Sequence, residues 1–355
     1  MNTCNVTVNR LPVKTWNRLR MNQASVSQVL VPEEGPLAAE GESLPEYSLA
    51  GAFQGMDTGC GSGLTELLEA GGIRPRILKA SGADHNNTFR LDYFFEDGGR
   101  AGHRTCLEVE EGSSAVVLMD FASPDQGAAG QGIVQTLIHL NKNARLHLVQ
   151  IQRVGQGYTF FNDLGAVCED GSALTLTQLV LSGAQSYTGV LSALRGAGSS
   201  LDASVAYSLR EQDRLDMNYV ARHYGRKTTS NISAAGTLRA GSFKLFRGTI
   251  DFIRGSAGAV GSEKEDVLLF DDSCINQTIP LILCEEEDVE GNHGASIGRP
   301  DEEVLFYLTS RGIPMEEAYA LLARARLDAA AGRIPEDAFR QEILEYIKKG
   351  GAANG

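Results

Sequence analysis

A short turn-forming tripeptide recurs through the middle of this 355-residue chain, and it constrains the fold more than any other feature. The tripeptides are Gly-Ser-Ser at 112–114, Asn-Ala-Arg at 143–145, Gly-Ser-Ala at 171–173 and Gly-Ser-Ser at 198–200. A strand-like run follows each one, and the spacings are 31, 28 and 27 residues. A turn and a strand that repeat at this interval indicate a solenoid, in which each coil buries its inner face by stacking on its neighbours.

The runs between these turns have the periodicity of strands. Apolar and polar residues alternate in Arg145–Ile151 and Leu174–Leu179, as expected for strands with one buried face. No long helical period interrupts residues 76–298. A β-sandwich would turn back roughly every 8–12 residues. We therefore predict a mainly β fold whose core, residues 76–298, is a right-handed parallel β-helix, and the 40 glycines suit its corners.

The segment before this core, residues 1–75, lacks a regular pattern. We expect a short helix over Leu11–Met21 and a loop over the acidic stretch Pro32–Gly63. The region is therefore interpreted as irregular and helical.

The segment after the core, residues 299–350, changes to a helical period. Three short amphipathic helices are marked by their starts and ends: Pro300 to Gly312, Pro314 to Gly332, and Pro335 onward. Helices this short cannot close a good core alone. We predict a C-terminal helical domain that packs both on the β-helix and on a partner.

Composition excludes several classes of protein. The net charge of −13 gives no electrostatic basis for binding nucleic acid. No run approaches the ~20 apolar residues that span a bilayer, and no signal segment is present, so we expect a soluble, cytoplasmic protein without membrane contacts. The six cysteines form no close pairs, which argues against disulfides and zinc ribbons. The sequence contains no P-loop, so ATP is not expected to bind here.

The segment from Cys274 to His293 is the densest in groups that carry chemistry. It combines a thiol, an imidazole and a run of carboxylates, and iron accepts these ligands. The two residues are 19 positions apart, about one coil, so they could meet on adjacent coils. The alternative is that Cys274 is an inert core residue and the acidic run a solvated face. Cys284 alternates with apolar residues and is expected in the core.

Other functions have weaker support. His223 lies beside Arg226 and Lys227, which would suit an anion or a solvated coil edge. The motifs of serine hydrolases and zinc proteases are missing from the sequence. A carbohydrate-active β-helix would need clustered carboxylates on one coil face, and Asp271 and Asp272 are adjacent rather than two apart.

The motifs after residue 220 resemble the SufB/SufD family of iron–sulfur cluster assembly scaffolds. The resemblance rests on an ordered series of segments: His223–Ser233, Asp266–Pro280, Asp288–Val289, His293–Gly298 and Asp301–Ala318. The opening Leu11–Asn17 is also similar to SufD-type proteins.

The resemblance implies a fold, a function and partners. The fold is a right-handed parallel β-helix flanked by N- and C-terminal helical parts. The function is that of a non-ATPase scaffold, not an enzyme, which assembles an iron–sulfur cluster transiently at its interface with a SufB-type subunit. The C-terminal helices bind the SufC ATPase, and ATP binds only to that partner. A homodimer, a purely structural subunit without cluster ligands, and a carbohydrate-active protein remain alternatives.

The resemblance also assigns residues. The cysteine of the SufB motif falls on Cys274, and the histidine that SufD contributes falls on His293. SufB has a glutamate after its histidine, whereas this chain has Gly294, as SufD-type proteins do. The N-terminal cysteine cluster of SufB has no counterpart. The residues predicted to contact the ATPase lie in the C-terminal helices: Phe306, Tyr307, Arg311, Ala318 and Leu322.

Overall fold

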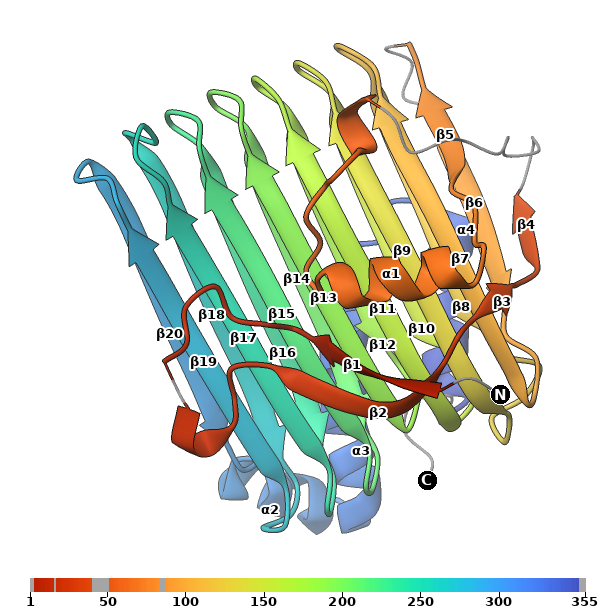
Figure 1. Ribbon diagram of the computed structural model, residues 1–355. Helices are drawn as coiled ribbons and strands as arrows, with labels where there is room; N and C mark the ends of the chain where they lie inside the picture. Colours follow the sequence, from red (N-terminus) through yellow and green to blue (C-terminus); the bar gives the residue numbers. More distant parts are fainter. Residues whose placement is uncertain (1–2, 16, 40–50, 83–86, 351–355) are drawn as a thin grey trace.

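Two long parallel sheets face each other through the whole molecule (Figure 1). The computed structural model describes residues 3–15, 17–39, 51–82 and 87–350. The even sheet consists of β4 (Leu37–Ala39), β6 (Thr88–Phe94), β8 (Ser114–Ala122), β10 (Arg145–Arg153), β12 (Ala173–Val180), β14 (Ser200–Leu209), β16 (Thr229–Leu238), β18 (Ala259–Leu269) and β20 (Val289–Gly298). The odd sheet consists of β3 (Glu33–Glu34), β5 (Arg76–Ala80), β7 (Gly99–Val109), β9 (Ala129–Leu140), β11 (Gly157–Cys168), β13 (Gln185–Leu194), β15 (Arg214–His223), β17 (Phe243–Phe252) and β19 (Ile275–Cys284).

Successive strands alternate between the two sheets, so the chain winds as a solenoid. From β5 onward, each strand pairs in parallel with the strand two places along the chain. Before that, β3 pairs in parallel with β7, and β4 pairs antiparallel with β6. The predicted fold class, a mainly β chain with a parallel β-helix and C-terminal helices, is confirmed.

The repeated tripeptides lie on top of one another at one corner of the coil. Arg145 is in register with Ser114 and Ala173, and Ala173 is in register with Ser200. The first residue of every tripeptide has a positive φ: Gly112 68°, Asn143 57°, Gly171 64° and Gly198 68°. Its N–H donates to a carbonyl of the next coil, as in the 2.8 Å bond from Gly198 to Arg226. The spacing seen in the sequence is therefore the length of one coil.

The side chains inside the coil form the main core. Along β8, Val117, Met119 and Phe121 point inward, while Leu118 between them points outward. The middle strands of this solenoid are buried on both faces because both sheets are covered from outside as well.

The N-terminal segment covers the outer face of the odd sheet, seen in red and orange in Figure 1. It comprises β1 (Thr3–Val8), the 3₁₀ helix η1 (Asn17–Leu19), β2 (Ala24–Leu30), the 3₁₀ helix η2 (Gly51–Phe53) and α1 (Ser62–Ala70). Strands β1 and β2 form an antiparallel pair. Polar contacts fasten them to the sheet, since the Gln131 side chain both donates to and accepts from the main chain of Leu30, at 2.7 and 2.8 Å.

The interpretation of residues 1–75 as irregular and helical needs correction in its details. Strands β1 to β4 fall where no strand was expected, and the helix expected over Leu11–Met21 is only η1, with Trp16 outside the described residues. Part of the stretch Pro32–Gly63 is also outside them, at 40–50. The alternation of buried and exposed residues in β1 and β2 is too short to predict a strand, because the odd sheet on which they pack is not evident from the sequence.

The C-terminal helices follow the solenoid, and the last two of them cover the outer face of the even sheet. They are α2 (Glu302–Ser310), α3 (Met315–Ala331) and α4 (Asp337–Lys348), and they follow the predicted proline and glycine boundaries closely. Leu327, Phe339 and Ile343 pack on Leu118, Val149 and other outward residues of the sheet. The division into 1–75, 76–298 and 299–350 remains a prediction.

Candidate functional site

The last coil of the solenoid, made of β19 and β20, is open on one side. Within the described part of the chain, β19 pairs only with β17 and β20 only with β18. Side chains of β20 are largely exposed and those of β19 partly so, including Ile297 (44%) and Ile275 (50%). The first coil differs, because β3, β4 and β5 cover it. Solenoids normally cap such ends, so an open one indicates a contact surface.

Cys274 lies in the turn that leads into β19. Its Sγ donates to the main-chain oxygens of Leu238 and Arg239, at 3.3 and 3.1 Å. The thiol is half-buried and packs against the main core. Asp271 builds the turn, because its carboxylate accepts from the hydroxyl and the N–H of Ser273 at 2.5 and 2.8 Å. These two hydrogen bonds lower the pKa of Asp271.

His293 lies on β20, in the open coil. It is in register with Glu263, which is buried inside the coil below. Because side chains at paired positions of parallel strands point the same way, His293 is on the interior side of the solenoid. It is nevertheless exposed, since β20 is the last strand of its sheet among the described residues.

The structure does not bring Cys274 and His293 together within one chain. His293 is level with Glu263 in the middle of β18, whereas Cys274 follows the turn after the end of that strand. A rise of about 3.3 Å per residue puts them roughly 20 Å apart along the strand direction. The expectation that they meet on adjacent coils is therefore wrong, because 19 residues are less than one coil of this solenoid.

Several buried charged groups lie in the coil directly below the open one. Lys244 forms an ion pair with Glu265, and Thr278 donates to Glu265 at 2.6 Å. Glu263 is also buried, and its carboxyl occupies the space beside Gly248, where a Cβ would come within 2.2 Å of it. Burial and the negative charge of Glu265 raise the pKa of Glu263 to about 8. The alternating Glu-Lys-Glu sequence at 263–265 could have signalled inward carboxylates.

Two further candidates have different surroundings from those expected. Cys284 is exposed, not in the core, because its interior-facing position on β19 lies in the open coil. His223 is fully buried, and its two ring nitrogens lie 2.8 Å from the hydroxyls of Thr228 and Ser230. Burial lowers the pKa of His223 to about 4. This histidine is a neutral part of the coil and not an anion site.

The predicted docking residues divide between surface and core. Phe306 and Tyr307 on α2 are 75% and 56% exposed, and the guanidinium of Arg311 lies 5.1 Å from the centre of the Tyr307 ring. Leu322 on α3 is half-buried. The prediction that Ala318 contacts a partner needs correction, because this residue is completely buried and cannot reach a partner in this conformation.

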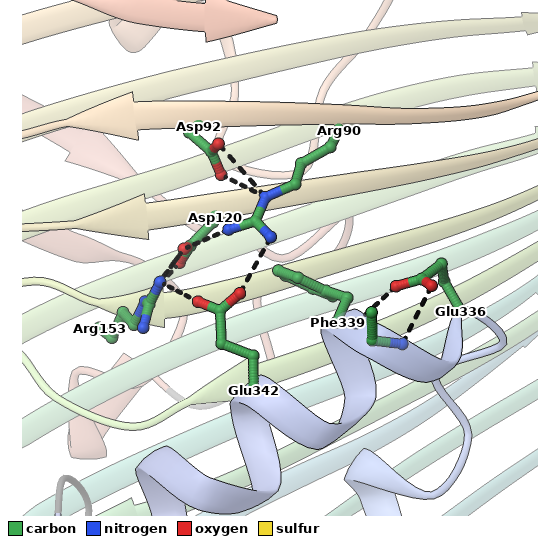
Figure 2. Close-up of polar contacts among 8 residues, drawn as sticks. Arg90, Asp92, Asp120, Arg153, Glu336, Phe339 and Glu342 are labelled. Carbon is green, nitrogen blue, oxygen red and sulfur yellow. Dashed lines mark hydrogen bonds and ion pairs between the residues drawn. The ribbon is translucent and has the colours of Figure 1, made fainter. Parts of the chain in front are cut away.

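Helix α4 is fastened to the first coils by a charged cluster that the sequence analysis did not identify (Figure 2). Glu342 accepts hydrogen bonds from Arg90 at 2.9 Å and from Arg153 at 2.7 Å. The Arg90 guanidinium also lies 4.9 Å from the centre of the buried Phe339 ring. Burial alone would raise the pKa of Glu342, but the two arginines lower it. Partners so distant in sequence leave no local signal.

Comparison with known proteins matches this architecture to a family. Residues 94–326 match the family described as SUF system FeS cluster assembly, SufBD core domain. The iron-sulfur cluster assembly protein SufD of Bacillus subtilis is 26% identical over 156 residues, which are 44% of this chain and 36% of that protein.

Two further relatives have the same family name. A SufBD family protein of Mycobacterium tuberculosis is 33% identical over 132 residues, covering 37% of this chain and 16% of the relative. One of Staphylococcus epidermidis is 25% identical over 257 residues, covering 69% of this chain and 52% of the relative. The chain thus spans at most about half the length of these relatives.

The fold defines this molecule as a parallel β-solenoid with an open last coil and covering helices. The chain belongs to the SufB/SufD family, whose core domain is described as part of SUF system FeS cluster assembly. No helix in the described part of the chain is long and apolar enough to cross a membrane.

Proposed function

We propose that this chain is a non-ATPase scaffold subunit, not an enzyme, and that an iron–sulfur cluster is assembled where its open coil meets a partner. The observation that carries the proposal is the open coil itself. It presents unpaired strand edges and exposed apolar side chains, and it holds both Cys274 and His293. We expect this complex to work in the cytoplasm.

The partner at the open coil is a SufB-type subunit or a second copy of this chain. Strand edges that lack a neighbour can pair with another chain through main-chain hydrogen bonds. The described residues contain no group of three side chains that could hold a metal ion. In the proposal, the partner supplies the remaining ligands, while Cys274 gives a thiolate and His293 an imidazole, both suited to iron. The cluster is a transient cargo.

The partner at the helices is a SufC-type ATPase, which alone binds ATP. The proposed contact surface is the exposed face of α2, with Phe306, Tyr307 and Arg311, together with the adjoining Leu322 on α3. Exposed aromatic residues and arginine are typical anchors of protein interfaces.

Anaerobic reconstitution tests the proposed chemistry. The chain is purified with a SufB-type subunit and the ATPase, supplied with ferrous iron and sulfide, and followed by absorbance of the cluster. Cys274→Ser and His293→Ala are each expected to lower the yield about tenfold or more, because each removes one ligand. Cys284→Ser is the matched control, since that thiol is in the same coil. Unchanged yields for both variants in an intact complex would disprove the chemical role.

Substitution on α2 tests the docking surface better than truncation does. Deleting residues 300–355 would uncover the apolar outer face of the even sheet, so loss of binding would be ambiguous. Phe306→Asp is expected to weaken ATPase binding about tenfold or more in calorimetry. Leu19→Asp, at a residue 58% exposed on the N-terminal segment, is the control. Equal affinities for the two variants would exclude this surface.

A further inference from the structure

The turn that carries Cys274 is in contact with the first residues of α3. The ring of Phe270, in that turn, stacks on the ring of Tyr319 with centroids 4.7 Å apart and planes inclined by 12°. On the neighbouring turn, Arg239 forms an ion pair with Glu316 at 3.2 Å. The Arg239 guanidinium also lies 6.0 Å from the centre of the Phe270 ring. Glu316 and Tyr319, which are neighbours on the surface of α3, thus contact the loops of two successive coils.

These same turns hold the thiol. The Sγ of Cys274 donates to the main-chain oxygens of Leu238 and Arg239, so Arg239 binds the thiol through its main chain and α3 through its side chain. Phe270 is only four positions before Cys274, and the N–H of Cys274 bonds to the oxygen of Asp271 between them, at 3.4 Å. The thiol is therefore engaged in hydrogen bonds and half-buried while α3 is in this position.

We propose that Arg239, Phe270, Glu316 and Tyr319 form a clamp that positions the Cys274 thiol, and that displacing the start of α3 releases it. This inference rests on the proposed function, because it concerns access to the thiol that would hold the cluster. Only residues 311–314 separate α2 from α3, so a partner bound on α2 is next to the clamp. Binding there can favour the released state only if the partner contacts that state better.

The ring stack is the stronger half of the clamp. Glu316 is largely exposed, with 78% of its side chain accessible, and exposed ion pairs contribute little. Two stacked rings add attraction beyond the area they bury. Loss of the Tyr319 ring should therefore release the thiol more than loss of the Glu316 charge.

Site-resolved alkylation of the purified full chain tests the clamp without any partner or iron. N-ethylmaleimide is added under native conditions and each cysteine is followed by peptide mass spectrometry. Tyr319→Ala is expected to raise the rate at Cys274 about three- to tenfold. Tyr319→Phe keeps the ring and should restore the wild-type rate. Phe94→Ala, which removes an exposed ring near the covered end of the solenoid, should leave the rate unchanged.

The other cysteines separate release of the thiol from general loosening. Cys284 is exposed and should react equally in all variants, while Cys106 and Cys168 are fully buried and should stay protected. An unchanged rate at Cys274 in Tyr319→Ala, with the buried thiols protected, overturns the clamp. If that variant also exposes the buried thiols, Glu316→Gln decides in the same way, with a smaller increase supporting the clamp and none refuting it. Because no cluster is involved, failure here leaves the reconstitution result intact, and the reverse also holds.

Discussion

At the scale of single residues, the corner formed by the repeated tripeptides requires a residue with a positive φ. In one coil this position is occupied by a lysine, which adopts a positive φ only at a cost in free energy. Lys227, with a φ of 55°, occupies the place that Gly198 and Gly258 hold in adjacent coils. A side chain costs about 1–2 kcal/mol in this conformation, and part of that is regained through a less flexible unfolded chain. We predict that Lys227→Gly raises the free energy of unfolding by about 0.5–1 kcal/mol in urea titrations.

The reverse substitution provides the control for this prediction. Gly198 has a φ of 68°, and a Cβ there would meet no atom within 4 Å, so only backbone strain opposes a side chain. Gly198→Ala should lower the free energy of unfolding by about 1 kcal/mol. If both changes shift stability in the same direction, the corner geometry is not what governs these positions.

Glu263 makes stability depend on pH in a direction opposite to that of most carboxylates. Its pKa is raised from 4.5 to about 8 in the folded chain. Between these values the unfolded chain has lost the proton while the folded chain keeps it, so the free energy of unfolding falls as pH rises, and it levels off above about pH 8. The groups that face it are Glu265, Lys244 and, one coil above, His293.

We therefore predict that Glu263→Gln stabilises the chain more at pH 8 than at pH 5, by about 2–4 kcal/mol relative to wild type. Denaturant titrations at the two pH values measure this difference. Glu111→Gln, at an exposed corner, should show almost none. A wild-type chain and a Glu263→Gln variant that respond identically to pH would refute the raised pKa.

At the scale of elements, α4 stays on the even sheet partly through Glu342. Glu342→Gln removes the charge that accepts from Arg90 and Arg153, and charge-assisted hydrogen bonds of this kind contribute about 1–3 kcal/mol. We predict faster hydrogen exchange of α4 amides by roughly tenfold, with β10 amides unchanged. The lowered pKa of Glu342 means that its contribution exists above the ordinary value of 4.5 and is lost as pH falls below it.

Glu345→Gln is the matched control, since it makes the same chemical change one turn along α4 at an exposed position. Its amide exchange should equal that of the wild type. Equal exchange in Glu342→Gln as well would show that apolar packing of Phe339 and Ile343 alone holds the helix.

The elements that the sequence predicts are those whose signal is local. The turn tripeptides indicate the coils because a positive φ needs particular residues at every corner, and prolines and glycines mark the helices after Pro300. The antiparallel pair β1 and β2 could not be predicted from the sequence, because its apolar residues pack on a sheet formed by residues far along the chain.

For the candidate site, the sequence proposes residues but does not give their arrangement. Cys274 and His293 are found through the family motif, whereas their separation depends on where the coil turns. The clamp joins Arg239 and Glu316 across 77 positions, a relation that appears only in the fold. Exposure of Cys284 depends on the absence of a further coil among the described residues, which alternation alone cannot reveal.

At the scale of the whole molecule, the two ends of the solenoid differ, and this difference predicts how the chain associates. Short strands cover the first coil, while the last coil exposes two strand edges with Ile275, Ile282 and Ile297. A lysine on such an edge opposes strand pairing, because it brings charge into the contact. We predict that Ile297→Lys weakens association with the proposed partner, a SufB-type subunit or a second copy, by about tenfold or more in sedimentation velocity. Phe94→Lys, at a residue 46% exposed near the covered end, should bind like the wild type. If Phe94→Lys alone disrupts the complex, the open coil is not the interface, and the cluster would have to be assembled elsewhere.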